Sequence, residues 1–129
     1  MTSSTTRTLY RPVGLYELQL IAEGGYKAFP RRLPHQPIFY PVLNEEYATQ
    51  IARDWNTRDT ASGYMGAVTA FNVDADYLSQ FAEQVVGGAS HRELWIPSEE
   101  LDTFNQHIVN GIQVIAAFYG DAFHGQKAW

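Results

Sequence analysis

Apolar side chains recur along this chain with two different periods. In several short segments they alternate with polar residues or form brief continuous runs. That pattern is typical of β-strands, in which successive side chains point to opposite faces. Elsewhere they recur every three or four residues, as they do along one face of an α-helix. The segments with the first pattern, which we predict to be strands, are 8–12, 38–43, 67–73, 85–86, 91–96 and 112–119.

Four helical stripes fall between these strands. Asn44, Asp74 and Ser98 each precede a stripe and favour a helix N-terminus, and Gly24 ends the first stripe, as glycine commonly does. Segment 26–37 contains three prolines and is predicted to be a long loop. The stripes consist of Leu15, Leu18, Ile21 and Ala22; of Tyr47, Ala48, Ile51, Ala52 and Trp55; of Tyr77, Leu78 and Phe81; and of Leu101, Phe104 and Ile108.

The order of the predicted elements is β-α-loop-β-α-β-α-β-β-α-β. Strands and helices do not alternate regularly, which favours an α+β fold over a doubly wound parallel sheet. Segment 112–119 is apolar nearly throughout and is expected to be a central strand. Segments 1–7 and 121–129 lack a clear period. We expect them to be flexible tails of a single domain that comprises residues 1–129.

The composition supports one hydrophobic core and excludes several classes of protein. With 129 residues, of which 45% are hydrophobic, the chain is large enough to fold without covalent staples. It has no cysteine, which excludes disulfides and thiolate metal sites. A net charge of −5 argues against nucleic acid as a partner. No run approaches the ~20 apolar residues of a membrane span, and the N-terminus lacks a signal core, so we expect a cytoplasmic protein.

Motifs with a specific chemistry are scarce. The sequence has no glycine-rich phosphate loop, no nucleophile elbow and no His-Glu-x-x-His pair. The four histidines are scattered, and none pairs with another at metal-ligand spacing, so no metal is expected.

Glu93 is the most informative candidate because carboxylates are depleted in β-strands. Alternation within 91–96 places Leu94 and Ile96 on one face of the strand, and His91, Glu93 and Trp95 on the other. Two interpretations stay open. The polar face is solvated, or Glu93 pairs with an Arg or Lys of a neighbouring strand; alternatively, the carboxylate is functional.

Segment Glu93-Leu94-Trp95-Ile96-Pro97 resembles the Glu-x-x-Ile-Pro pattern that surrounds the catalytic glutamate of the ADP-ribosyltransferase superfamily. His91 stands two positions earlier, where several members carry Glu or Gln. Leu9-Tyr10-Arg11 resembles the first strand of those enzymes, which holds NAD. The run from Leu9 to Phe118 also looks like a set of small bacterial proteins that carry an ADP-ribosylation/crystallin-type label, through shared phrases at 9–14, 36–44 and 93–101.

The resemblance implies a split, mostly antiparallel sheet with short flanking helices, and cleavage of the nicotinamide–ribose bond of NAD. Glu93 would then be catalytic, with His91 as a second polar residue on the same face. Arg11 and Tyr10 would bind the NAD. The Ser-Thr-Ser-like triplet of the middle strand is missing here, so Tyr40 or Tyr47 would position the nicotinamide. No metal is implied.

These residue types suit that chemistry. A carboxylate beside the ribose stabilises the positive charge that develops as the glycosidic bond breaks, and the planar fork of an arginine matches a diphosphate or a ribose hydroxyl. ADP-ribose would pass to water or to an unknown acceptor, either a protein or a small molecule. The alternatives are a non-catalytic ligand-binding or protein-interaction module of the same fold, and RNA 2′-phosphate removal with NAD as co-substrate. The chain has no evident basic surface for the latter.

Overall fold

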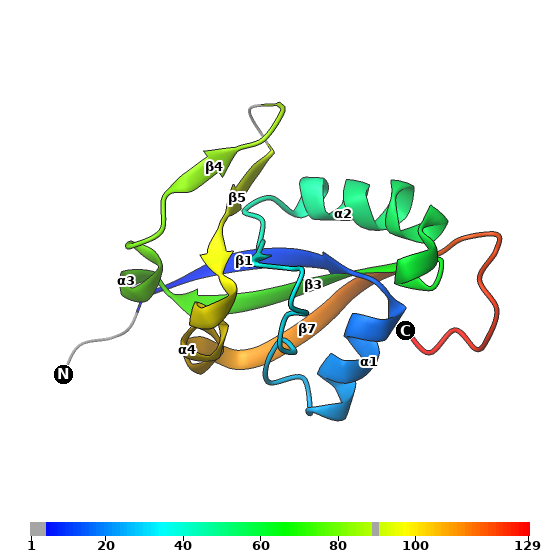
Figure 1. The fold of residues 1–129 in the computed structure, drawn as a ribbon, viewed down its shortest axis with the longest axis horizontal. Helices are drawn as coiled ribbons and strands as arrows, with labels where there is room; N and C mark the ends of the chain where they lie inside the picture. Colours follow the sequence, from blue (N-terminus) through cyan, green and yellow to red (C-terminus); the bar gives the residue numbers. More distant parts are fainter. Residues whose placement is uncertain (1–4, 89–90) are drawn as a thin grey trace.

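An antiparallel sheet of three strands in the order β1-β3-β7 forms the centre of the molecule (Figure 1). The structure, a computed structural model, describes residues 5–88 and 91–129. The three strands are β1 (Thr6–Val13), β3 (Met65–Asp74) and β7 (Ile108–Tyr119). β1 begins earlier than predicted, so Thr6 and Arg7 belong to a strand rather than to a tail. Of the rest of that predicted tail, Thr5 has no helix or strand, and residues 1–4 lie outside the described residues.

β3 is the central strand, and the prediction that segment 112–119 is central was wrong. β3 pairs with β1 on one side and with β7 on the other. β7 is therefore an edge strand, and its Val109 and Ile115 are exposed. An apolar run shows that side chains favour burial, but it does not tell whether both backbone edges are hydrogen-bonded.

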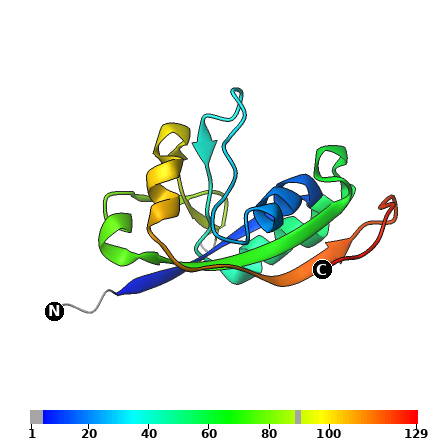
Figure 2. The ribbon, with the colours of Figure 1, turned by 90° about the horizontal axis from the view of Figure 1, so that it is seen from below.

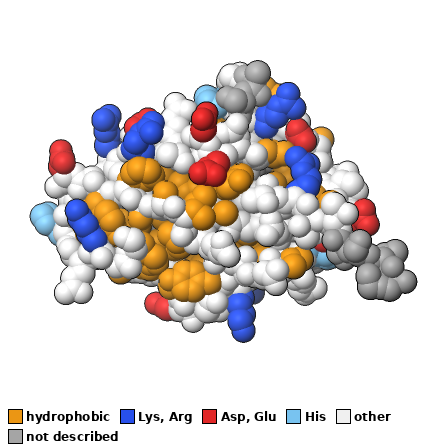
Figure 3. Space-filling view, turned by 180° about the vertical axis from the view of Figure 1, so that it is seen from behind, with side chains coloured by type: hydrophobic (Ala, Val, Ile, Leu, Met, Phe, Trp, Pro, Cys, Tyr) orange, Lys and Arg blue, Asp and Glu red, His pale blue; other side chains and the backbone are white. Residues whose placement is uncertain are grey.

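Apolar side chains form a broad patch on the back of the molecule (Figure 3).

One face of the sheet carries the main hydrophobic core. This face is covered by α1 (Leu15–Glu23), α4 (Leu101–Gln106) and the predicted loop 26–37, which has no helix or strand (Figure 2). The ring of Phe29 lies 4.8 Å from that of Phe71 and 5.0 Å from that of Phe39, between centroids. The loop therefore contributes to the core despite its irregular backbone.

The opposite face is covered in part by α2 (Glu45–Asp54). Asn44 caps this helix as predicted, because its Oδ1 accepts a hydrogen bond from the Tyr47 N–H at 3.0 Å. Ala52 is fully buried against the sheet. The close approach requires Gly66 in β3, since a Cβ at this position would collide with the carbonyl oxygen of Ala52.

Two short ribbons extend the structure beyond β1. β4 (Glu83–Val85) pairs with β5 (Arg92–Leu94), and β2 (Ile38–Phe39) pairs with β6 (Ile96–Pro97). Val42 forms isolated bridges to both Tyr10 in β1 and Glu93 in β5, so this residue joins the ribbon β4–β5 to the central sheet. Every strand pairing among the described residues is antiparallel, which confirms the α+β class.

The predicted strands 38–43 and 91–96 are both interrupted. Pro41 has no N–H for a ladder, and the first strand is reduced to β2 and the bridge at Val42. The second is divided into β5 and β6 at Trp95. Leu94 and Ile96 are nevertheless fully buried, which confirms their prediction as the inner face.

The elements that flank the ribbon β4–β5 differ in their boundaries from those predicted. Ser98–Glu100 forms a 3-10 turn, and Glu100 rather than Ser98 precedes α4. Ile108, predicted to lie in the stripe of that helix, instead begins β7. Asp74 caps α3 (Ala75–Leu78) as predicted, accepting from the Asp76 N–H at 3.0 Å.

The C-terminal segment ends against the body of the protein. Trp129 donates from its Nε1 to the Tyr26 hydroxyl at 3.0 Å, and its backbone N–H donates to the Tyr119 hydroxyl at 3.1 Å. Within the described ranges, no helix combines the length and the apolar character that crossing a membrane requires.

Candidate functional site

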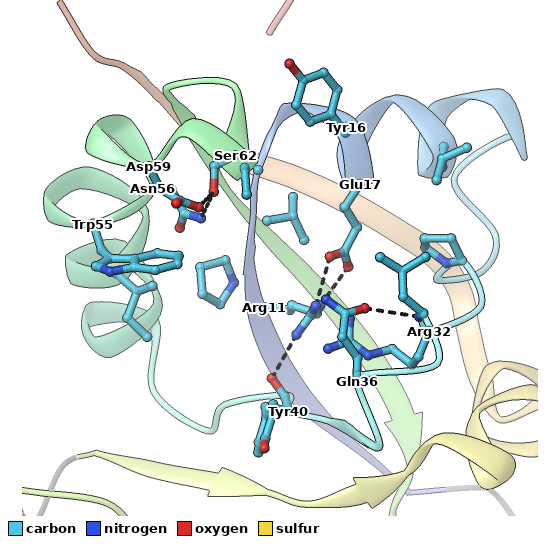
Figure 4. A pocket seen from close by; sticks show the side chains of 18 of the residues that line it. Arg11, Tyr16, Glu17, Arg32, Gln36, Tyr40, Trp55, Asn56, Asp59 and Ser62 are labelled. Atoms are coloured by element: carbon cyan, nitrogen blue, oxygen red, sulfur yellow. Dashed lines mark hydrogen bonds and ion pairs between the residues drawn. The ribbon is translucent and has the colours of Figure 1, made fainter. Parts of the chain in front are cut away.

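A cleft of about 640 Å³ runs along β1 on the side that faces away from β3 (Figure 4). This volume is within the range of small-molecule sites. One wall comes from α1, and another from the end of α2 and the 3-10 turns Asn56–Arg58 and Thr60–Ser62. Residues that line the cleft include Arg11, Glu17, Arg31, Arg32, Gln36, Tyr40, Trp55, Asn56, Asp59, Ser62 and Glu93.

The cleft opens where β1 stops pairing with the segment around Val42. The Tyr10 N–H donates to the Val42 carbonyl at 2.9 Å, and the Val42 N–H donates back to the Tyr10 carbonyl at 2.7 Å. The backbone carbonyl of Arg11 points instead toward β3, where it accepts a hydrogen bond from the Thr69 hydroxyl at 2.8 Å. The next residue to face the cleft is Pro12, which has no N–H. Pairing therefore ends here without leaving a backbone donor unsatisfied at this position.

Arg11 lines the cleft, but its guanidinium is engaged by protein groups. Nε and Nη2 donate to the two carboxylate oxygens of Glu17 at 2.7 and 2.8 Å, and Nη1 donates to the Tyr40 carbonyl at 3.3 Å. The residue is 8% exposed, and its guanidinium carbon lies 4.7 Å above the centre of the Phe39 ring. A bidentate, largely buried pair of this kind holds both partners firmly. Each nitrogen of Arg11 thus already has a partner.

Arg32 offers a second guanidinium over the same ring. Its central carbon lies 6.0 Å from the centre of Phe39. Its Nε is buried without a hydrogen-bond partner, and no hydrogen bond or ion pair within the described residues involves the rest of its guanidinium. Burial, with Arg11 nearby, lowers the pKa of Arg32 below its ordinary value. This wall of the cleft therefore contains a cation that forms no ion pair within the described residues, although the Glu17 carboxylate acts on it electrostatically.

Glu93 lines the cleft from β5 and is held by two neutral donors. Its Oε1 accepts from the Trp95 indole N–H at 2.8 Å, and its Oε2 accepts from the Tyr47 hydroxyl at 3.3 Å. Its cross-strand neighbour in β4 is Gln84. The interpretation that Glu93 pairs with an Arg or Lys is therefore wrong within the described residues, where this half-buried carboxylate has no counter-ion.

Three other predicted residues gather around Glu93. The His91 ring stacks on that of Tyr47, with centroids 4.4 Å apart and planes at 12°. Burial and the Glu93 carboxylate raise the pKa of the Tyr47 hydroxyl above its ordinary value. Tyr40 lines the cleft and meets Trp95 edge to face, at 6.5 Å between centroids. The structure therefore brings Glu93, His91, Tyr47 and Tyr40 together.

Tyr10 is not part of this group, and Trp55 has a different place from the one predicted. Tyr10 packs with the small cluster under α2, because alternation along β1 turns it away from the side of Arg11. Trp55, predicted in the buried stripe of α2, follows the end of that helix and is 60% exposed at the cleft. Its indole thus forms part of the rim rather than the core.

Sequence reasoning missed the partners that define these groups. Glu17 lies in a helix whose apolar stripe gave no sign of an ion pair with Arg11. Trp95 was placed on the face of Glu93, and its spacing of two residues was a usable signal, since such side chains share one side of a strand. On the far wall, Asn56 donates from Nδ2 to the Ser62 hydroxyl at 2.8 Å, which donates to Asp59 at 2.6 Å. This network depends on turns that no pattern identified.

Comparisons of the chain with protein-family models, with curated proteins and with solved structures find no match. Among the described residues, no group of three or more His, Asp or Glu side chains is arranged to hold a metal ion.

Proposed function

We propose that the cleft binds NAD and that the protein cleaves the nicotinamide–ribose bond, passing ADP-ribose to an acceptor or to water. The observation that carries this proposal is Glu93, a carboxylate that lines a cleft of suitable volume, is held there by Tyr47 and Trp95, and has no counter-ion among the residues that the structure describes. The resemblance of segment 93–97 to the ADP-ribosyltransferase pattern supports the same assignment.

In the proposed reaction the C–N bond between ribose and nicotinamide breaks first, and its electron pair leaves with nicotinamide as a neutral molecule. The ribose carbon becomes oxocarbenium-like and positively charged. Glu93 stabilises that charge, because an anion preorganised in a half-buried site needs no reorganisation when the charge develops. An acceptor hydroxyl or a water molecule then forms the new bond and loses its proton to Glu93 or to solvent.

The surrounding rings have supporting roles in this proposal. Tyr47 orients the Glu93 carboxylate by its hydrogen bond and is itself held by the stacked ring of His91. Tyr40 supplies an aromatic surface for the nicotinamide, with its ring kept in place by Trp95. His91 positions the acceptor or the ribose. Arg11, which we expected to hold the NAD, instead maintains the wall of the cleft through Glu17.

One observation favours a second candidate, a non-catalytic module that binds a ligand or another protein. The Arg11 guanidinium, which the resemblance assigns to NAD, is committed to Glu17 and to the Tyr40 carbonyl. In such a module Glu93 would be a polar residue of the binding surface, and the cleft would bind its ligand without chemistry.

Nicotinamide release from NAD separates the two candidates. Purified protein is incubated with NAD, with and without a mixture of protein and small-molecule acceptors, and free nicotinamide is followed by chromatography. The proposal predicts release that depends on protein concentration. Binding of NAD by calorimetry without any release would support the module, and neither binding nor release would contradict the proposed substrate.

A further inference from the structure

The charges on the α1 side of the cleft do not balance. Arg11 and Glu17 form a bidentate pair, with N–O distances of 2.7 and 2.8 Å, and together contribute no net charge. Arg32 lines the same wall above the same Phe39 ring and forms no ion pair among the described residues. The adjacent Arg31 also lines the cleft. This surplus of positive charge lies in a chain whose formal charge is −5.

Leaving Arg32 without a partner is costly for the protein on its own. Its Nε is buried from water and makes no hydrogen bond, and removing a charged donor from water is unfavourable unless it is paired. Arg11 adds electrostatic repulsion, and burial together with Arg11 lowers the pKa of Arg32 against the opposing effect of Glu17. A ligand that brings negative charge to Arg32 would relieve both effects. Figure 4 shows Arg32 and Gln36 on one side of Arg11, with Trp55 and Asn56 on the other.

The guanidinium fork indicates which anion this is. The two parallel N–H donors of a guanidinium match two oxygens of a phosphate group. The adjacent Arg31 and Arg32 together suit a diphosphate better than a single carboxylate. We infer that Arg32, rather than the first-strand Arg11, is the contact of this cleft for phosphate oxygens of the ligand. This inference rests on the proposed function only in identifying those oxygens with the diphosphate of NAD.

Glu17 has a defined part in this arrangement. It neutralises Arg11 and so keeps that guanidinium away from the ligand. Replacing Glu17 by Gln removes its charge while keeping its shape, and leaves two uncompensated cations beside the anion. The structure therefore assigns opposite effects to the two neighbours: loss of Arg32 weakens anion binding, and loss of the Glu17 charge strengthens it.

Calorimetric titration with inorganic pyrophosphate, phosphate and ADP tests the inference on the intact chain. Arg32→Gln is expected to weaken pyrophosphate and ADP binding at least about tenfold, the equivalent of one lost charge-assisted hydrogen bond. Arg32→Lys retains the charge without the planar fork, so its affinity for pyrophosphate and ADP should lie between that of the wild type and that of Arg32→Gln. Arg53→Gln is the matched control, since Arg53 pairs with Asp54 outside this cleft, and it should bind as the wild type does. Circular dichroism checks that each variant is folded.

The remaining arms identify the source of the phosphate and separate this inference from the proposed function. ADP binding more tightly than pyrophosphate or phosphate indicates a nucleotide diphosphate, whereas the reverse order indicates free phosphate or pyrophosphate. Glu17→Gln should bind pyrophosphate more tightly than wild type. If NAD is cleaved, Arg32→Gln should raise KM with little change in kcat. Wild-type protein that binds neither pyrophosphate nor ADP, or Arg32→Gln that binds them equally well, overturns the inference even where nicotinamide is released.

Discussion

Arg11 and Glu93 line the same cleft from two different strands, but only Arg11 forms an ion pair among the described residues. Arg11 in β1 is 8% exposed and locked onto the carboxylate of Glu17. Glu93 in β5 is half-buried, and within the described part of the chain its carboxylate accepts hydrogen bonds only from the neutral groups of Tyr47 and Trp95. The first charge is cancelled within the protein, and the second is oriented but retained.

This difference separates a structural charge from an available one. A buried ion pair is expensive to break because the remaining partner loses its compensation, so Arg11 contributes mainly to the fold. Neutral donors fix the direction of a carboxylate while leaving its charge for a ligand or a transition state. On this basis we expect the residues that act on a ligand to be Glu93 and Arg32, whose guanidinium forms no ion pair among the described residues.

One of the two largest expected effects on stability comes from Arg11→Ala. Removing the guanidinium leaves the Glu17 carboxylate largely buried without its partner, which we expect to lower the free energy of unfolding by about 3 kcal/mol. Glu93→Gln, by contrast, keeps a hydrogen-bonding side chain and should change it by less than about 1 kcal/mol. Urea denaturation measures both. Arg53→Ala, at an exposed ion pair, serves as the control and should show no measurable change. Equal losses for Arg11→Ala and Glu93→Gln would remove the contrast.

A second effect of similar kind concerns the inner face of the strand that carries Glu93. Leu94 is fully buried in the main core, so Leu94→Ala should cost about 2–5 kcal/mol of unfolding free energy, through lost burial and the cavity that remains. Val85 in the neighbouring strand β4 is 56% exposed, and Val85→Ala should have a much smaller effect. A Leu94→Ala variant as stable as Val85→Ala would mean that β5 is not anchored as described.

The hydrophobic pattern predicted much of this architecture. It failed for features that depend on contacts between residues distant in the sequence. Leu94 and Ile96 were identified as an inner face because alternation reports burial directly. Val42, which joins two sheets through bridges to Tyr10 and Glu93, has no local signature, since pairing depends on distant backbone. For the candidate site, the pattern and the resemblance together identified Glu93 and its neighbours His91, Tyr40 and Tyr47. The Arg11–Glu17 pair was missed because the orientation of a helix relative to a strand is set by packing.

A smaller effect concerns pH and the hydrogen bond between Tyr47 and Glu93. The pKa of the Tyr47 hydroxyl is raised in the folded protein, first by burial and then by the carboxylate. A raised tyrosine pKa gives stability that is complete below the unfolded value of about 10 and declines as pH rises toward the folded value. Tyr47→Phe should therefore flatten the loss of stability above pH ~10. The pKa of Tyr77 is also raised, by burial and by Glu100. Tyr77→Phe should therefore change the pH dependence of stability in the same direction as Tyr47→Phe. Unfolding curves at pH 8 to 11 that coincide for wild type and Tyr47→Phe would contradict the proposed environment of Tyr47.

The most direct test of the account compares nicotinamide release from NAD by wild type and by Glu93→Gln, with NAD binding measured on the same samples. Because Glu93 is proposed to act on charge that develops only in the transition state, its substitution should lower kcat about a hundred- to a thousandfold and leave NAD affinity nearly unchanged. His91→Ala, as the neighbouring control, should reduce kcat less. Release by Glu93→Gln at the wild-type rate would assign the chemistry to other residues and contradict the central claim.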